Sequence, residues 1–374
     1  AKTLKVARRY GVNIPHICVT GFTTDGPIRR QAEREGNFGL GDNFIIARSL
    51  YISQKAYPTE GDFRYARSLE AKLAKRQEEL RDQLLETEIG WSKSKDEGGI
   101  FVPAGINKNI QFSTPGHFYW LWDIILNGSL GRLLEKQPNL KYLFVHNIDN
   151  LLATLDEETL GLHIQNGKAV SAEVSAITFE NSGGGLYWFT LTELAKKTLG
   201  IEKDRILGLL EAPSCPTIAD EFKAEFFNVA SYWITLDKVF QEIGITREEV
   251  IGISRGDREI LRAVQGKLLE FENRLANYVT IRPVIEDYGL GRRDKMKVAQ
   301  FEKFWGDASW IIPFGYILSG PDRSVHIKEI AHRNLYMDRG LMKYLLPELP
   351  RGRLFALMLP LVILGRNCTE LLMD

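Results

Sequence analysis

The chain contains little cysteine. Its three cysteines, Cys18, Cys215 and Cys368, lie far apart in 374 residues. They form neither a CxxC pair nor a Cys/His cluster, which excludes a zinc site of the usual spacing and a disulfide framework. A few isolated cysteines are typical of a protein that works in a reducing compartment.

The sequence also lacks an excess of charge of either sign and a long apolar run. Lys plus Arg and Asp plus Glu number 48 each, so no overall field favours nucleic acid or an anionic membrane. The most apolar run, residues 354–364, is interrupted by Pro360 and is shorter than the about 20 residues that span a bilayer. We expect it to be a buried terminal segment and predict no membrane span.

The common nucleotide motifs are absent. No GxGxxG or GxxxxGK[ST] segment occurs, which excludes the usual dinucleotide-binding and P-loop sites. No Ser/His/Asp arrangement indicates a nucleophilic hydrolase. An anionic ligand would therefore have to be held by local groups.

What is present is an alternation of helical and strand patterns, which predicts an α/β fold with parallel core strands. Two antiparallel strands are predicted within 169–193, around the glycines Gly183 to Gly185. Helices are predicted for Lys2–Tyr10, Asp25–Glu35, a charged stretch Arg64–Glu88, Phe118–Glu135 and most of Thr235–Asn277, strands for Ile14–Thr20, Asn43–Ile52 and Tyr142–Val145, and a loop for Ser92–Gly99.

The strongest strand pattern ends in a polar segment. Tyr142 to Val145 leads into His146-Asn147-Ile148-Asp149-Asn150. In open α/β sheets ligands bind at the carboxyl ends of strands, and a carboxylate there suits Mg²⁺, which prefers oxygen ligands and bridges phosphates. Asp149 is therefore a candidate metal ligand. The alternative is that Asp149 only caps the following turn.

Two glycine-containing turns are candidates for ligand contact. Pro115-Gly116-His117 precedes a predicted helix, whose N-terminal amides could approach a phosphate; the alternative is an ordinary turn. Gly183-Gly184-Gly185 would allow close ligand approach, and here the alternative is a hairpin turn.

Taken in order, several segments resemble the UDP-glucose pyrophosphorylase family. Each is short, and their order along the chain carries the resemblance. The segments are Tyr10–Pro15, Gly21–Asp25, Gln54 before Tyr57-Pro58, Pro115–His117, Asn147–Asn150 with Ala153, Glu173-Val174, Gly184-Gly185, and Phe227-Asn228 with Trp233.

The resemblance implies a GT-A-like mixed sheet flanked by helices, with a smaller C-terminal region. Residues 1–250 would form the catalytic domain and residues 251–374 the C-terminal region. It also implies formation of UDP-glucose and pyrophosphate from UTP and glucose 1-phosphate, with Mg²⁺. By this mapping Asp149 and His117 are catalytic and Asp149 holds the metal. Gln54, Gly116, His117 and Asn147 bind the nucleotide, and Glu173, Gly184 and Asn228 face the hexose.

Two later segments, Tyr278–Val284 and Gln300–Asp307, resemble the plastid-type branch of the family. That branch implies a location in the plastid stroma and a role in supplying the sulfolipid head group. In a bacterium the expected location is the cytoplasm.

Some family features are missing. The Gly-rich nucleotide loop would precede Ala1, and Ile177, Gly183 and Ala299 stand where the family has lysine. Four cations could replace these lysines: Arg282, Arg292, Arg293 and Lys297. The alternative is that these residues only form a solvated charged loop.

These departures leave a second hypothesis open. The chain could be a homologue with weakened catalysis that serves as a structural or scaffold subunit. Its docking surfaces would then be the charged helix Arg64–Glu88 and the apolar run 354–364. The resemblance also allows a homo-oligomer or a larger complex. Nucleic acid is not expected as a partner.

Overall fold

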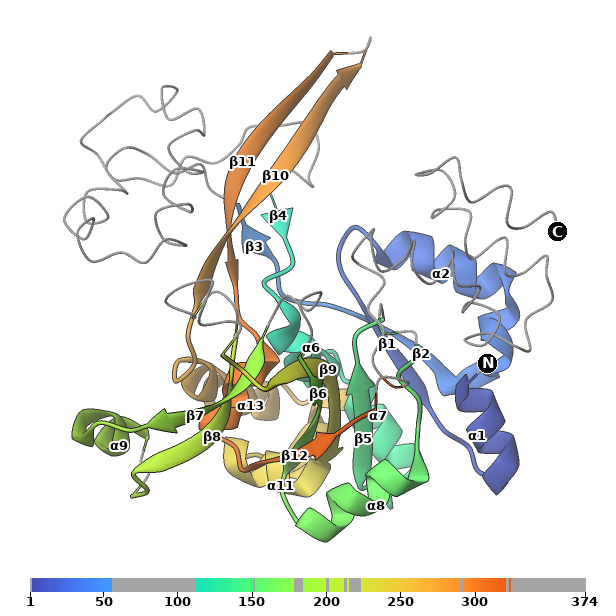
Figure 1. Ribbon diagram of the computed structural model, residues 1–374. Coiled ribbons are helices and arrows are strands. Elements are labelled where there is room, and N and C mark those ends of the chain that lie inside the picture. The colour runs from blue at the N-terminus through green and yellow to red at the C-terminus, as the bar shows by residue number, and fades with distance from the viewer. Residues whose placement is uncertain are drawn as a thin grey trace, which may run out of the picture.

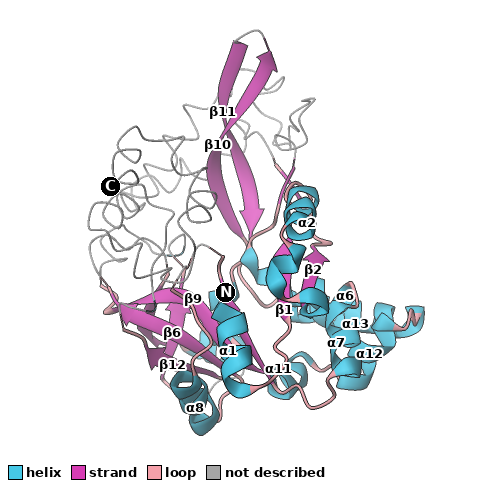
Figure 2. Cartoon of the chain, turned by 90° about the vertical axis from the view of Figure 1, so that its right-hand side faces the viewer, coloured by secondary structure: helices cyan, strands magenta, loops and turns pink. Residues whose placement is uncertain are grey.

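The structure is a computed structural model that describes residues 2–55, 112–148, 150, 152–177, 184–199, 202–211, 214, 223–289, 292–320 and 323. The predicted helix Arg64–Glu88, the loop Ser92–Gly99 and the apolar run 354–364 lie outside these residues. Figures 1 and 2 show the arrangement from two sides.

The helices and strands follow one another along the chain in this order: α1 (Lys2–Tyr10), β1 (His16–Thr20), α2 (Asp25–Arg34), η1 (Gly36–Gly39), η2 (Gly41–Asn43), β2 (Phe44–Arg48), β3 (Ser53–Gln54), β4 (Phe112–Ser113), η6 (His117–Tyr119), α6 (Trp120–Leu126), α7 (Ser129–Lys136), β5 (Tyr142–His146), α8 (Glu157–Asn166), β6 (Val170–Ala176), β7 (Gly185–Thr190), α9 (Glu193–Leu199), β8 (Arg205–Leu210), β9 (Phe226–Thr235), α11 (Leu236–Ile243), α12 (Arg247–Ser254), α13 (Arg258–Glu272), β10 (Tyr278–Gly289), β11 (Arg292–Glu302), η8 (Trp305–Trp310) and β12 (Phe314–Leu318).

The centre of the fold is a six-stranded mixed sheet with the order β12-β6-β9-β7-β8, in which β5 also pairs with β9 (Figure 1). β12 runs parallel to β6, whereas β9 is antiparallel to β6, β5 and β7. The predicted mixed α/β sheet is confirmed. The expectation of parallel core strands holds, among the described strands of this sheet, only for the pair β12–β6.

Strand β9 corrects a second expectation. The sequence predicts neighbouring antiparallel strands within 169–193, joined by a glycine hairpin. The two strands exist as β6 and β7, but β9 lies between them and pairs with both. β9 buries side chains from both of its faces, Val229, Tyr232 and Trp233 among them. A strand that is apolar on both faces is stabilised at the centre of a sheet, between two others.

The long helix predicted over Phe118–Glu135 is interrupted. It consists of η6, α6 and α7, with a break at Asn127-Gly128. Gly128 has a φ of +75°, a conformation that favours glycine, and the Asn127 side chain accepts a hydrogen bond from the Ser129 amide at 2.9 Å. The break turns α7 toward α12. The two helices pack so closely that a Cβ at Gly131 would lie 2.4 Å from the Val250 carbonyl oxygen.

The cationic segment near residue 290 is a strand pair rather than a solvated loop. β10 and β11 pair over their length in an antiparallel register that sets Arg282 opposite Val298 and Lys297 opposite Pro283. The pair extends away from the central sheet as a two-stranded ribbon (Figure 2). The backbone pairing of β10 with β11 places Arg282, Arg292, Arg293 and Lys297 on strands.

The hydrophobic core joins the sheet to the helices α6, α7, α11, α12 and α13. Its largest fully buried side chains include Trp122, Trp305, Phe118 and Phe240. The first strand pair, β1–β2, is tied to this core by Asp123 on α6, which accepts a hydrogen bond from the Leu50 amide at 2.7 Å. No helix among the described residues is both long and apolar enough for a membrane crossing.

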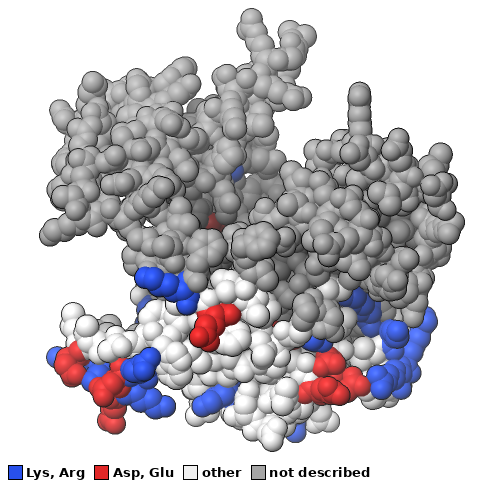
Figure 3. Space-filling model, viewed as in Figure 1, with Lys and Arg blue, Asp and Glu red and all other residues white. Residues whose placement is uncertain are grey.

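Charges of both signs share the surface visible in Figure 3. Arg9 on α1 lies 3.0 Å from Glu157 on α8, and Lys196 on α9 pairs with Glu193. The described part of this face thus carries no field of one sign, in line with the balanced composition.

Helix α8 packs on the sheet through a buried histidine. The His163 ring contacts the Ser171 hydroxyl at 2.7 Å and the Thr235 hydroxyl at 2.9 Å. Burial, and secondarily Lys238, lowers the pKa of His163 to about 4.

His163 should therefore make the fold sensitive to acid. Its pKa is lower in the folded than in the unfolded state, so the unfolded chain binds the extra proton and stability is lost as pH falls through 6.5 toward 4. Between pH 7.5 and pH 5 we expect the free energy of unfolding to fall by on the order of 1–2 kcal/mol more in the parent than in His163→Gln. Urea unfolding at the two pH values measures this, and an equal fall in both proteins would contradict it.

Candidate functional site

A gap in the sheet brings three of the predicted site residues together. On one side of β9, β5 ends where His146 pairs with Ser231, and β7 begins where Gly185 pairs with Phe227. The β9 residues between them, 228–230, have neither strand beside them. Asn147 follows the end of β5, Gly184 precedes the start of β7, and Asn228 lies on β9 between the two.

The backbone at this gap is held in an unusual shape. The Asn228 amide donates to the Gly184 carbonyl oxygen at 2.9 Å, and the Asn228 side chain accepts a hydrogen bond from the Ala230 amide at 3.1 Å. Ala230 has a φ of +54°, which is uncommon for a residue with a side chain. Such conformations are stabilised by their surroundings and gather at functional sites.

A buried carboxyl group lies beside Gly184. Glu211 follows β8, and only 8% of it is exposed. A Cβ at Gly184 would lie 2.9 Å from its Oε2, and a Cβ at Gly306 would lie 2.3 Å from its Oε1. The two glycines therefore leave the space that Glu211 occupies.

Asp307 provides a second buried carboxyl group. It accepts a hydrogen bond from the Tyr278 hydroxyl at 3.1 Å, and Tyr278 in turn accepts one from Ser214 at 2.7 Å. Burial, together with the nearby Asp307, raises the pKa of Glu211 to about 8, and burial raises the pKa of Asp307 to about 6. Glu211 Oε1 and Asp307 Oδ2 are buried and find no hydrogen-bond partner in the described part of the chain. Buried oxygens of this kind are suited to accept hydrogen bonds from a ligand rich in hydroxyl groups.

An aromatic contact connects this carboxyl pair to the Pro115-Gly116-His117 turn. The Tyr278 ring lies 5.2 Å from the Phe304 ring, and the Phe304 ring lies 5.2 Å from the imidazole of His117. His117 Nδ1 accepts a hydrogen bond from the Trp305 amide at 3.3 Å. A neutral imidazole in this arrangement carries its proton on Nε2, where it can donate.

Position 116 requires a glycine, because the backbone at Lys303 packs closely against it. Gly116 has a φ of +92°, and a Cβ there would lie 2.3 Å from the Lys303 carbonyl oxygen. The Lys303 amide donates to the Pro115 carbonyl at 2.9 Å, and the Phe118 amide donates to the Lys303 carbonyl at 3.2 Å. The turn is thus fixed at the beginning of η6.

Gln54, the predicted uracil contact, lies next to the strand that leads into this turn. It is exposed on β3 and pairs with Phe112 on β4, three residues before Pro115. The structure therefore brings the predicted nucleotide residue Gln54 beside the segment that leads to Gly116 and His117, and places Asn147 at the sheet gap.

Glu173 lies apart from the other two predicted hexose residues. Its neighbours on β6, Ala172 and Val174, pair with Tyr232 and Asn228, so the Glu173 side chain points to the opposite face of the sheet. Its carboxylate accepts hydrogen bonds from the Trp233 indole at 2.9 Å, the Ser319 hydroxyl at 2.7 Å and the guanidinium of Arg323 at 2.8 and 3.0 Å. A hexose contact for Glu173 stays a prediction.

Asp149, the predicted metal ligand, falls outside the described residues. Among the residues that are described, no group of three or more His, Cys, Asp or Glu side chains could hold a metal ion. A magnesium ion bound by one carboxylate and by substrate phosphates needs no such group. The adjoining Asn147 and Asn150 are held by a hydrogen bond from the Asn150 amide to the Asn147 carbonyl at 3.1 Å.

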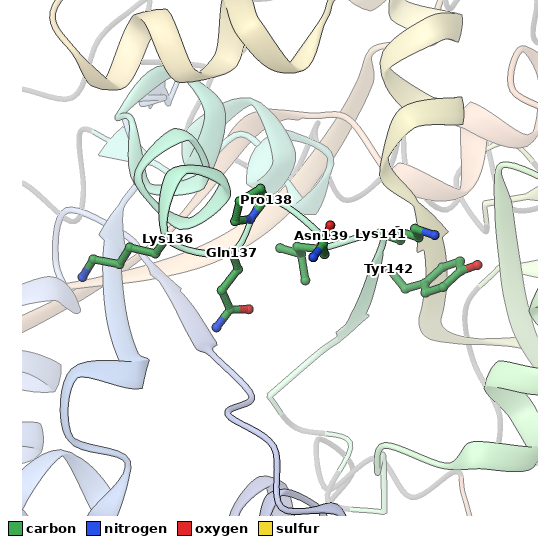
Figure 4. Close-up of a pocket in the computed structure, with 7 residues that line it drawn as sticks. Lys136, Gln137, Pro138, Asn139, Lys141 and Tyr142 are labelled. Carbon is green, nitrogen blue, oxygen red and sulfur yellow. The ribbon is translucent and has the colours of Figure 1, made fainter.

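A shallow hollow of about 540 Å³ opens elsewhere, between α7 and β5 (Figure 4). It is lined by residues 136–142, which include no carboxylate and no histidine. It lies at the amino end of β5, whereas Asn147 lies at the carboxyl end, where ligands of open α/β sheets bind. We therefore locate the candidate site at the sheet gap.

Sequence reasoning missed Glu211, Asp307 and Tyr278. Glu211 directly follows the apolar strand β8, in the position that made Asp149 a candidate after β5. The sequence pattern could therefore have indicated Glu211 as a candidate site residue. The role of Asp307 could not be inferred, because its partners Tyr278 and Glu211 are distant in the sequence.

The chain is similar to known proteins in two respects. Residues 97–255 match the family model for UTP--glucose-1-phosphate uridylyltransferase. The fold matches a UDP-glucose phosphorylase from Trypanosoma brucei with a TM-score of 0.53 and 17% identity over 88% of this chain and 55% of that one. No curated protein sequence matches.

UDP-glucose pyrophosphorylase structures from Leishmania major match to a similar degree. A point mutant in complex with UDP-glucose has a TM-score of 0.52 and 18% identity, and a second point mutant has a TM-score of 0.51 and 17% identity. Both matches cover 88% of this chain and 56% of the other. The chain thus spans a little over half the length of the solved structures it resembles, and the likeness supports the fold.

Proposed function

We propose that this chain is a uridylyltransferase of the UDP-glucose pyrophosphorylase family, which forms UDP-glucose and pyrophosphate from UTP and glucose 1-phosphate. The observation that supports it best is the grouping of Asn147, Gly184 and Asn228 around one gap in the sheet, beside the buried carboxyl pair. The family match over residues 97–255 supports the same reaction class.

In this proposal the two parts of the site bind the two substrates. Gln54, Gly116 and His117 face the nucleotide. Gly184, Asn228 and Glu211 contact the hexose, and Asp307 with Tyr278 completes the acceptor side. Glycines at 184 and 306 leave room for the Glu211 carboxyl group beside Asn228.

The reaction joins the two substrates at phosphorus. An oxygen of the glucose 1-phosphate attacks the α-phosphorus of UTP, the bond to the β-phosphate oxygen breaks, and pyrophosphate leaves with that electron pair. The protein contributes mainly positioning and charge neutralisation. Mg²⁺, which Asp149 and the phosphates would hold, supplies positive charge when bound.

The proposal has a direct test. The parent should release pyrophosphate from UTP and glucose 1-phosphate in the presence of Mg²⁺, and Asp149→Ala should lower kcat/KM at least tenfold, since it removes a carboxylate oxygen from the metal. Equal rates for the two proteins would remove Asp149 from the mechanism. An inactive parent would favour the alternative, a homologue that serves as a structural subunit.

Two finer parts of the proposal rest on the resemblance alone. They are the plastid location and the supply of UDP-glucose for sulfolipid synthesis, both inferred from residues 278–284 and 300–307. Fractionation of the source cells and lipid analysis of a strain without the gene would test them.

A further inference from the structure

A buried ion pair between Glu173 and Arg323 lies next to the loop that follows β5. Glu173 on β6 is 1% exposed, and the Arg323 guanidinium binds both of its carboxylate oxygens, Nε at 3.0 Å and one terminal nitrogen at 2.8 Å. A paired contact of this kind fixes the orientation of the guanidinium as well as its place. Trp233 on β9 and Ser319 after β12 donate to the same carboxylate.

Arg323 also contacts the loop that follows β5, residues 147–156. Its two terminal nitrogens donate to the hydroxyl and to the carbonyl of Thr154, each at 3.2 Å. Its own carbonyl oxygen accepts a hydrogen bond from the Asn150 side chain at 3.3 Å. The same guanidinium lies 4.0 Å from Asp156, the N-cap residue of α8.

Hydrogen bonds inside the loop extend this connection. The amide of Leu152 donates to the Asn150 side chain at 3.3 Å, and the amide of Ala153 donates to the Asn150 carbonyl at 3.3 Å. Asn150 also donates to Ser231 on β9 at 3.3 Å. Arg323 therefore contacts the loop on both sides of its turn, at Asn150 and at Thr154.

We propose that Glu173 and Arg323 are positioning residues that hold the loop 147–156 at the gap in the sheet. Asn147, a nucleotide contact in the predicted site, belongs to this loop, and its carbonyl accepts the hydrogen bond from the Asn150 amide at 3.1 Å, so the pair sets how firmly the nucleotide side of the site is held. The nucleotide part rests on the proposed function; the structural part does not. This assigns to the Glu173 carboxylate a role inside the protein in place of a contact with the hexose.

The structural part is tested by amide hydrogen exchange on the ligand-free proteins. In Arg323→Gln and Glu173→Gln we expect the amides of Asn150, Leu152 and Ala153 to exchange at least tenfold faster than in the parent. The amides of β7 should be unchanged, which shows that the sheet is intact. Arg255→Gln breaks an exposed pair with Glu135 and serves as the matched control, with no change expected in the loop.

Thr154→Val covers the case in which the buried pair cannot be altered without loss of folding. It removes one acceptor of Arg323 and keeps the ion pair, so we expect exchange in the loop to rise about threefold. Unchanged exchange in Thr154→Val and in any folded variant of the pair would overturn the proposal, whether or not the parent shows enzyme activity.

The nucleotide part is tested by pyrophosphate release at increasing UTP concentration. A misplaced binding group can cost a factor of about ten or more. In Glu173→Gln KM for UTP should rise about tenfold, while KM for glucose 1-phosphate stays within about twofold. A raised KM for glucose 1-phosphate with unchanged KM for UTP would instead assign Glu173 to the hexose. An inactive parent would count against the proposed function and leave the exchange result to decide.

Discussion

Replacing Gly116 by alanine is expected to lower the free energy of unfolding by about 3–5 kcal/mol, among the largest effects of a single substitution. Two costs combine. Gly116 has a φ of +92° and a ψ of 173°, a region that residues with a side chain rarely adopt, at a cost of about 1–3 kcal/mol. The new Cβ would also lie 2.3 Å from the carbonyl oxygen of Lys303, a backbone atom held by the Phe118 amide.

Gly256→Ala is the matched control. Gly256 has a φ of +87°, and a Cβ there meets no atom within 4 Å. Gly256→Ala should therefore lower the free energy of unfolding only by the cost of the positive φ, about 1 kcal/mol. Urea unfolding of the parent and both variants separates strain from steric contact. Equal losses in the two variants would show that the turn does not depend on its contact with Lys303.

The same substitution should also weaken nucleotide binding. A displaced turn moves His117 away from the Trp305 amide that orients its imidazole. Titration with UTP is expected to show at least a tenfold loss of affinity in Gly116→Ala and none in Gly256→Ala.

Replacing Glu211 by glutamine is expected to stabilise the protein at alkaline pH and to weaken hexose binding. Burial and Asp307 raise the pKa of Glu211 to about 8. The folded state therefore keeps a proton that the unfolded chain releases above about pH 4.5, and stability falls as pH rises from 4.5 to 8. Glutamine has no charge to bury, so the variant should lose this dependence.

The stability difference should appear only above the ordinary pKa of glutamate. At pH 8.5 we expect Glu211→Gln to be more stable than the parent by on the order of 2 kcal/mol or more, and at pH 4.5 to be about equal. Unfolding in urea at both pH values measures it. The exposed Glu242→Gln should show no such difference, and a destabilised Glu211→Gln at pH 8.5 would contradict the prediction.

The loss of hexose binding follows from the same group. Above about pH 8 Glu211 is ionised, and sugar hydroxyls that donate to the carboxylate then form hydrogen bonds to a charged group, which contribute about 1.5–3 kcal/mol. At pH 8.5 we therefore expect KM for glucose 1-phosphate to rise at least tenfold in Glu211→Gln. A gain in stability together with a loss in binding is the behaviour of a residue that is retained for its function.

The local elements of this protein could be predicted because their signals lie within a few residues. The apolar period of Lys2–Tyr10 and the glycine after it define α1, and the compact apolar run Tyr142–Val145 defines β5. The order of short motifs along the chain similarly indicated the fold class. Each of these patterns is complete within one element or its turn.

The arrangement of the sheet could not be predicted in the same way. β9 comes after β8 in the chain, yet it lies between β6 and β7. Strand neighbours are selected by burial of both faces of β9, which depends on residues far away in the sequence. The break at Gly128 was missed for a similar reason, since a single glycine does not end a helix unless packing, here against α12, favours it.

The sequence by itself determined the α/β class and brought Gly116, His117, Gly184 and Asn228 to attention as residues of a site. Only the tertiary structure decided that Asn228 faces the gap in the sheet with Glu211 and Asp307, while Glu173 points to the opposite face and binds Arg323. The physical reason is the strand period of two: which face a side chain occupies is fixed by the register between distant strands, and a local sequence pattern does not contain that register.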